Sequence, residues 1–285
     1  HQFHAQGHLS GMRQAAVNRN GTGRRLMACR WCVGLLVGLT GLSWSGCGLA
    51  AAPMADTARS VGHRLSVAVG SVSIKEGFNG GMVFNGPQAV VRYELHWAAA
   101  GFDFSYNPEL ALGLPLSRGM AAVNLQITPV ELAFQAPVWR SARHRLLLGG
   151  EVAARYRYQE YPDLQNAHLF WFCEIGLSWR LGYAFQWQGG RLSLQWRNSL
   201  LGFVSHTPDN PPYFYSLAFA DFVVRPHQTL QFGSFNRYDR TVLRLEYAPA
   251  ALPTHVFGVG LEYVGYYGAI RYQTLNCYLS WRKVF

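Results

Sequence analysis

Lysine is almost absent from this chain of 285 residues, since Lys75 and Lys283 are its only two lysines. Charged residues of all kinds make up 14% of the sequence, well below the quarter that is usual in soluble domains. Such a low share indicates a surface that does not face water everywhere. The positive charge comes almost entirely from arginine, which suits packed, bidentate charge pairs better than lysine does.

Cysteine is also scarce, and its five residues are too few and too badly spaced for a disulfide framework or a metal site. Cys29 and Cys32 form a C-x-x-C pair, but they lie between a charged and an apolar region, where no thioredoxin-like fold could hold them. Cys173 and Cys277 fall among apolar residues, where thiols behave as small hydrophobes. We therefore expect no metal and no cofactor.

Runs of basic residues are missing too, despite a formal net charge of +10. A nucleic-acid-binding surface needs its basic residues in a cluster or along one face, whereas the arginines beyond the first sixty residues are scattered singly. We therefore expect no nucleic-acid partner. Part of the excess lies near the N terminus, at Arg24, Arg25 and Arg30.

The first sixty residues are typical of a targeting region, because those three arginines precede an uncharged stretch over 31–55. We interpret residues 1–26 as an upstream tail and basic leader region, and 27–55 as the apolar and cleavage region of a signal peptide. Two alternatives are a retained transmembrane helix, for which the stretch is long enough, and a lipid anchor at Cys47.

Apolar and aromatic residues alternate with polar ones along most of the remaining chain. Between 168 and 187 the odd positions from Leu169 to Phe185 are apolar, whereas Glu174, Ser178 and Arg180 take even positions. Successive side chains on a strand point to opposite faces, so the pattern predicts strands with one apolar and one polar face. These apolar faces are longer and more aromatic than a soluble sheet needs, which predicts lipid beside them.

The last strand has an apolar face made of Leu275, Cys277, Leu279, Trp281 and Phe285. It resembles the closing strand of bacterial outer-membrane β-barrels, and the chain is similar in style to barrels of the Bacteroidota that have no established activity. In outer-membrane barrels the terminal aromatic strand is recognised by the barrel-assembly machinery. The resemblance therefore implies an assembly signal at Trp281 and Phe285, and a location in the outer membrane of a Gram-negative bacterium.

Patterning and resemblance together predict an all-β fold, a single antiparallel transmembrane β-barrel over residues 61–285. About ten residues per crossing gives about 12 strands, with 10 or 14 as alternatives. Residues 101–116 are expected to form a longer loop, and a β-bulge should follow Asn198. Turn residues predict connections at one end over 139–144, 188–190, 225–228 and 249–253, and at the other over 160–167, 206–212 and 236–240.

The polar faces of these strands carry many carboxylates and guanidiniums, which we predict to share the barrel lumen. They are Arg92, Glu94, Glu151, Arg155, Arg157, Glu174, Arg180, Arg197, Arg244, Glu246 and Glu262. Paired charges can fill and stiffen the interior of a small barrel. Alternatively, they can line a narrow path in which surplus arginine favours anions.

The predicted function is therefore a narrow pore, or an accessory or structural barrel of an envelope assembly. Expected partners are outer-membrane lipid and lipopolysaccharide, the barrel-assembly machinery during insertion, and other envelope proteins. The alternative is a membrane-embedded lipid hydrolase of the phospholipase or lipid A deacylase type, with Ser205, His206 and Asp209 as candidates. Neighbouring residues on a strand point to opposite faces, so we expect no catalytic pair there.

Overall fold

The computed structural model describes residues 61–77, 79–99, 101–163, 169–207, 221–234, 237–268 and 271–285, without the side chains of 221–223. The predicted leader lies outside the described residues, so the signal peptide stays a prediction. In the described part of the chain, no helix has the length and apolar character needed to cross a membrane.

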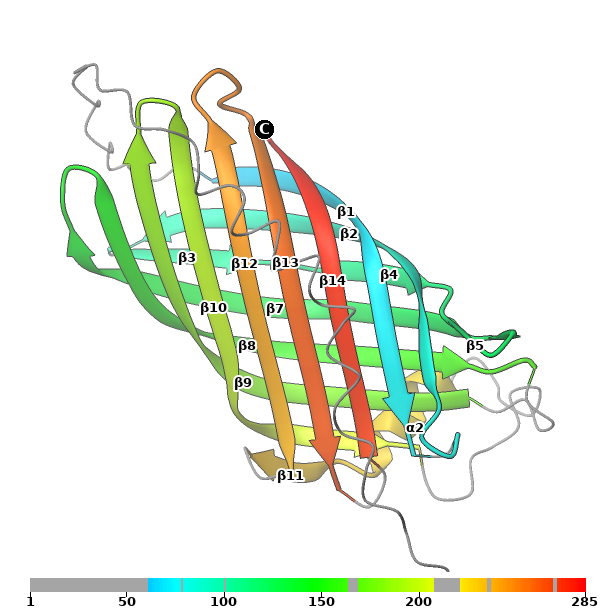
Figure 1. Ribbon diagram of the computed structural model, residues 1–285. Coiled ribbons are helices and arrows are strands. Elements are labelled where there is room, and N and C mark those ends of the chain that lie inside the picture. Colours follow the sequence, from blue (N-terminus) through cyan, green and yellow to red (C-terminus); the bar gives the residue numbers. More distant parts are fainter. Residues whose placement is uncertain are drawn as a thin grey trace, which may run out of the picture. The chain divides into compact units, whose positions relative to one another are not determined.

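Antiparallel strands dominate the described chain, and all the strands of the barrel wall except β3 and β4 are long (Figure 1). They are β1 (Gly62–Glu76), β2 (Val83–Ala99), β3 (Phe102–Tyr106), β4 (Glu109–Gly113), β7 (Val123–Arg140), β8 (His144–Glu160), β9 (Leu169–Trp187), β10 (Gly190–His206), β12 (Tyr238–Pro249), β13 (His255–Tyr267) and β14 (Arg271–Val284). The remaining elements are β5 (Leu116–Ser117), β6 (Met120–Ala121), α2 (Asp221–Gln228) and β11 (Gln231–Ser234).

The sheet closes into a barrel because β1 pairs with β14 on one side and with β2 on the other. From β14 the order continues through β13, β12, β10, β9, β8 and β7. Between β7 and β2, the strands β3 and β4 together make one crossing that is interrupted at Asn107 and Pro108. Counted in this way, ten strands of the described chain close the barrel, which is one of the expected numbers.

Two segments differ from the sequence-based expectation. Residues 101–116 contain β3 and β4 instead of a long loop, because Asp103, Ser105 and Glu109 keep an inward alternation on both sides of Pro108. Residues 225–228 belong to α2 and do not form a turn between two crossing strands. Because β11 pairs with the last residues of β10, α2 and β11 lie at the same end of the barrel (Figure 1).

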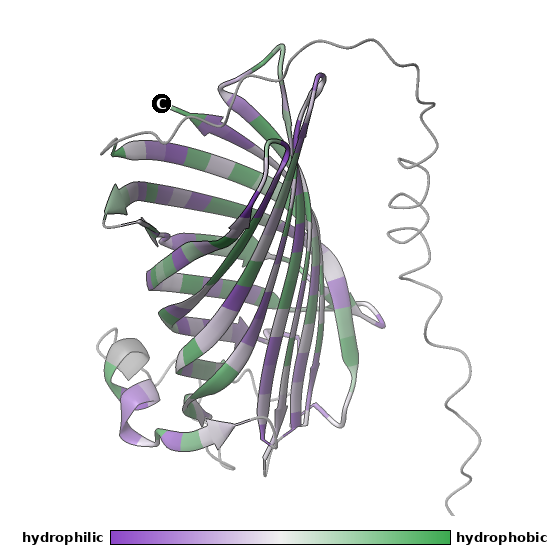
Figure 2. Ribbon diagram, turned by 90° about the vertical axis from the view of Figure 1, so that its left-hand side faces the viewer, coloured by the Kyte–Doolittle hydropathy of each residue, from purple (hydrophilic) through white to green (hydrophobic). Residues whose placement is uncertain are grey.

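Side chains are sorted between the two faces of the barrel wall as the alternation predicted, and Figure 2 shows the resulting bands along the strands. The outward residues Val69 and Leu279 are 60% and 58% exposed, whereas the inward Glu151 and Glu174 are 0% and 1% exposed. The predicted bulge is confirmed by a register shift between Ser199 and Leu201. An apolar exterior around a polar interior is the arrangement that lipid requires of a barrel.

The two ends of the barrel differ in their connections. Short turns join β2 to β3, β7 to β8, β9 to β10 and β12 to β13 at the end that holds the C terminus (Figure 1). The opposite end carries the longer segments after β8 and β10. Outer-membrane barrels have short periplasmic turns and longer extracellular loops. The C-terminal end is therefore the periplasmic end, and the opposite end is here called the outer end.

Candidate functional site in the barrel interior

The middle of the interior is filled by buried, oppositely charged side chains, here called the central network. Its members are Glu131 of β7; Glu151, Arg155 and Arg157 of β8; Glu174 and Arg180 of β9; Arg197 of β10; Arg240 of β12; and Glu262 of β13. No member has a side chain more than 10% exposed. Each of these six strands contributes at least one inward charged residue to the network.

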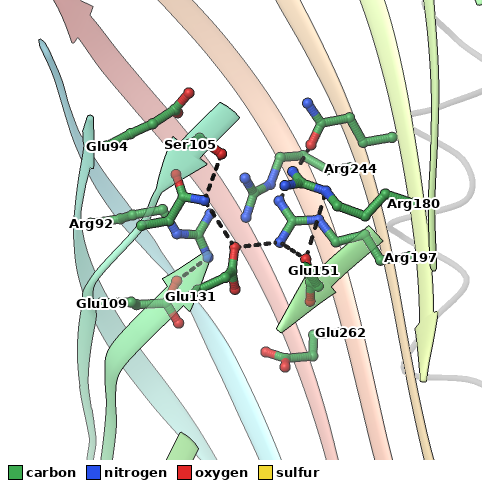
Figure 3. Close-up of polar contacts among 12 residues, drawn as sticks. Arg92, Glu94, Ser105, Glu109, Glu131, Glu151, Arg180, Arg197, Arg244 and Glu262 are labelled. Atoms are coloured by element: carbon green, nitrogen blue, oxygen red, sulfur yellow. Dashed lines mark hydrogen bonds and ion pairs between the residues drawn. The ribbon is translucent and has the colours of Figure 1, made fainter. Parts of the chain in front are cut away.

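Glu151 lies at the centre of this network. Its carboxylate is 2.7 Å from Arg155, 3.2 Å from both Arg197 and Arg240, and 3.6 Å from Arg180. Figure 3 shows Arg197 and Arg180 approaching it from neighbouring strands. An ionised carboxylate has about four acceptor sites, so four guanidiniums can be accommodated around one carboxylate.

Arg155 and Glu262 extend the network to the other strands. Arg155 donates to Glu174 at 2.7 Å and to Glu131 at 2.9 Å. Glu262 accepts from Arg240 at 2.7 Å and from Arg157 at 3.1 Å. Each carboxylate of the network thus meets at least two guanidiniums, which compensates the charges that burial would otherwise leave unsolvated.

A second group of charges lies nearer the periplasmic end and is here called the periplasmic network. It consists of Arg64 of β1, Glu94 of β2, Glu246 of β12 and Arg282 of β14. Arg282 bridges the two carboxylates, at 3.1 Å from Glu94 and 2.6 Å from Glu246, and Arg64 is 2.6 Å from Glu94. These contacts join strands on both sides of the β1 and β14 seam that closes the barrel.

A cavity lies between the two networks, with an empty volume of about 730 Å³ that includes the solvent at its mouth. We call it the periplasmic cavity. Its polar lining includes Arg64, Gln88, Arg92, Glu94, Glu109, Gln126, Arg244, Glu246, Glu262, Asn276, Tyr278 and Arg282. A smaller cavity of about 250 Å³ shares Glu109, Gln126 and Glu262 with it and reaches the central network.

The outer end of the interior is closed by apolar and aromatic side chains, here called the aromatic cap. They are Val72, Ile74, Phe84, Ala122, Tyr161, Phe170, Phe172, Val204, Tyr238, Val264, Tyr266 and Tyr272. The Phe172 ring lies 4.9 Å from the ring of Tyr272 and 5.7 Å from that of Tyr266. Burial raises the pKa of Tyr161, which follows β8 and is fully buried in this cap.

The structure divides the predicted lumen residues among these features. Glu151, Arg155, Arg157, Glu174, Arg180, Arg197 and Glu262 lie in the central network. Glu94 and Glu246 lie in the periplasmic network, and Arg92 and Arg244 line the cavity between them. Arg92 is paired with Glu109 of β4. The predicted assembly-signal residues lie at the periplasmic end, where Trp281 faces outward and Phe285 follows β14.

Sequence reasoning missed several interior charges, above all Glu131, Arg240 and Arg282. Glu131 follows a register shift between Ile127 and Val130, which moves the inward positions of β7 from even to odd numbers. Following the alternation separately on each side of that shift could have found it. The turn residues over 236–240 predict a loop that includes Arg240, whereas Arg240 is the third residue of β12.

The candidate catalytic residues of the hydrolase alternative lie on opposite faces of β10. Ser205 faces outward, and its hydroxyl donates to the backbone carbonyl of Pro226 in α2. His206 faces the interior, where its ring lies 5.1 Å from that of Tyr266. Asp209 lies outside the described residues. Ser205 and His206 are therefore not placed as a nucleophile and its base. Nor do the described residues include a group of three or more potential metal ligands.

Comparisons with known proteins found no matching family model and no matching curated protein. Similar solved structures include the outer membrane protease OmpT from Escherichia coli, with 8% identity over 80% of this chain and 99% of that chain and a TM-score of 0.49. The translocator domain of the autotransporter NalP from Neisseria meningitidis has 7% identity over 90% and 95% of the two chains and a TM-score of 0.42. An outer membrane channel from Pseudomonas putida F1 has 12% identity over 82% of this chain and 100% of that chain, with a TM-score of 0.37.

The closed antiparallel wall, its apolar exterior and its polar interior define the class of protein. The chain is an outer-membrane β-barrel protein, located in the outer membrane of a Gram-negative bacterium.

Proposed function

We propose that this protein is a closed accessory barrel, a structural component of an outer-membrane assembly, and not an open pore. The aromatic cap is the observation that carries this proposal, because none of its residues is more than 3% exposed. An ion entering from the outer end meets this apolar layer first and the central network next. Side chains commonly fill the interior of barrels this small.

The central network supports the same proposal, because it holds the wall together from inside. Its ion pairs connect β7, β8, β9, β10, β12 and β13 across the lumen. Charged, hydrogen-bonded pairs of this kind are directional, so they fix the positions of the strands that carry them. On the outside, exposed apolar side chains such as Val69 and Leu279 contact membrane lipid and lipopolysaccharide.

A gated narrow pore is the second candidate, and the two connected cavities favour it. They provide polar walls from the periplasmic side as far as the central network. Among the described residues, the central network and the aromatic cap interrupt this path. The two networks and the cavity lining together hold nine arginines and seven glutamates. Because of this arginine surplus, a path opened through the cap would prefer anions.

Planar-bilayer conductance of the refolded barrel tests the proposal. The parent protein, Glu151→Gln and Arg155→Gln should all give no stepwise current, because the cap remains in each. Steady stepwise currents from the parent would contradict a closed barrel.

Variants of the cap separate the two candidates. The double variant Phe172→Ala and Tyr272→Ala removes two stacked rings of the cap. Anion-selective currents from this variant, with a silent parent, would favour the gated pore, whereas continued silence would favour the accessory barrel. The matched control is Phe203→Ala with Phe257→Ala, two outward aromatic residues that are 50% and 44% exposed, and it should stay silent in either case.

A further inference from the structure

We infer that the periplasmic cavity binds a small oxyanion, a carboxylate or phosphate group, and that Arg244 holds it. The carboxylates that line the cavity all have an arginine partner already. The pairs are Glu94 with Arg64 at 2.6 Å, Glu246 with Arg282 at 2.6 Å, Glu262 with Arg240 at 2.7 Å, and Glu109 with Arg92. A cation would therefore find no carboxylate whose charge is uncompensated.

Arg244 is the exception among the arginines of the cavity lining. Its one ion pair within the described residues is with Glu246, at 4.0 Å, and Glu246 already binds Arg282 much more closely. The Nε and Nη2 atoms of Arg244 both donate to the Tyr278 hydroxyl, at 3.2 and 3.0 Å. A guanidinium has five N–H donors, so Arg244 retains donors and a positive charge that no nearby carboxylate matches. Its 5% exposure means that water does little to solvate this charge.

Three amide side chains of the lining give a second, independent observation. Gln88, Gln126 and Asn276 are 6%, 6% and 4% exposed, and each has one buried amide atom with no hydrogen-bond partner among the described residues. The atoms are Oε1 of Gln88, Oδ1 of Asn276 and Nε2 of Gln126. Buried polar atoms in folded proteins nearly always have a partner, so these two acceptors and one donor indicate that the cavity holds a polar molecule that both donates and accepts hydrogen bonds. The hydroxyl of hydrogen phosphate or of citrate can supply that donor.

The donors of the cavity suit an oxyanion. The unpartnered Nε2 of Gln126 can donate to it, and so can the remaining N–H groups of Arg244. The Tyr278 hydroxyl accepts its two bonds from Arg244 and keeps its own hydrogen to donate. Charge-assisted bonds from a guanidinium to a carboxylate or phosphate are among the strongest hydrogen bonds in proteins. Arg92 and Arg244 reach into the interior from different strands, as Figure 3 shows.

The anion would enter from the periplasm. Arg64 and Arg282, which line the cavity, lie close to the periplasmic ends of β1 and β14. The aromatic cap separates the cavity from the outer end.

Calorimetric titration of the refolded protein with inorganic phosphate and, separately, with citrate tests this site at constant ionic strength. Saturable binding of at least one of the two is expected, and which one binds identifies the anionic group. Arg244→Gln should weaken binding at least about tenfold, because it removes the charge-assisted bonds. Arg244→Lys should retain part of the affinity, since it keeps the charge without the planar fork.

Arg145→Gln is the matched control, because it removes an equal charge from an arginine that pairs with Asp103 and does not line the cavity. Its binding should equal that of the parent. The inference is overturned if the parent binds neither anion, if Arg244→Gln binds as the parent does, or if Arg145→Gln loses as much affinity. Should Arg244→Gln not refold, Tyr278→Phe removes the hydroxyl that positions Arg244 and should weaken binding as well. Conductance is not involved, because a closed barrel and a gated pore can both hold an anion here.

Discussion

Glu151 and Arg155 lie four residues apart on β8, and their side chains meet inside the barrel, with Arg155 Nη2 2.7 Å from Glu151 Oε1. A strand rises about 3.3 Å per residue, so the two Cα atoms are separated by about 13 Å along β8. The arginine must therefore extend along the strand to reach the carboxylate. The central network consequently spans several levels of the barrel and is not a single ring of charges.

Glu151→Gln should destabilise the barrel by about 3–5 kcal/mol, because it leaves several buried guanidiniums without the carboxylate that they share. Urea unfolding of the detergent-solubilised barrel, followed by tryptophan fluorescence, measures this change. Glu160→Gln is the control, since Glu160 is the last residue of the same strand and lies outside the central network. Equal loss of stability in both variants would show that the network does not stabilise the barrel.

The two arginines of the periplasmic network should differ in importance. Arg282 bridges Glu94 and Glu246 and is 12% exposed, whereas Arg64 contacts Glu94 and is 26% exposed. Arg282→Gln should therefore cost about 3 kcal/mol, and Arg64→Gln about 1 kcal/mol or less. Urea titrations of the two variants give this ranking directly, and the reverse order would refute the bridging role of Arg282.

Much of the wall could be predicted from sequence, because alternation is a local property. Over β9, the apolar odd positions from Leu169 to Phe185 define the outward face without any knowledge of the neighbouring strands. The bulge after Ser199 was also predictable, since Leu200 and Leu201 break the alternation in the sequence. Prolines caused the errors. Pro108 interrupts a crossing without ending it, and Pro226 lies inside α2, although the sequence predicts a turn over 225–228.

The candidate site could be predicted only as a list of inward charges. Which charges meet depends on barrel closure and strand register, and both are set by contacts distant in sequence. Arg157 and Glu262 are 105 residues apart, and Arg282 and Glu94 are 188 residues apart. The cavity and the aromatic cap could not be foreseen for the same reason, because they exist only where several strands face one another.

Lipid hydrolysis should be absent, because Ser205 and His206 lie on opposite faces of β10. We expect the parent protein, like Ser205→Ala and His206→Ala, to release no product from labelled phospholipid or lipopolysaccharide. Turnover by the parent that is lost in both variants would contradict this geometry.

Ser205→Ala should lower the free energy of unfolding by about 1 kcal/mol, since it removes the hydrogen bond to the Pro226 carbonyl. Faster proteolysis next to α2 would reveal that loss.

Gly70 should be intolerant of any side chain, because β1 and β14 approach closely where the barrel closes. A Cβ added at Gly70 would lie 1.9 Å from the backbone oxygen of Cys277 and 2.6 Å from the Cα of Tyr278. Neither backbone atom can move without separating the paired strands. Gly70→Ala should therefore lower the free energy of unfolding by about 1–3 kcal/mol or more, as overpacking does in protein cores. Gly62→Ala is the matched control on the same strand, because an added Cβ there meets nothing within 4 Å. Urea unfolding that shows equal stability for the two variants would mean that the seam can relax around a methyl group.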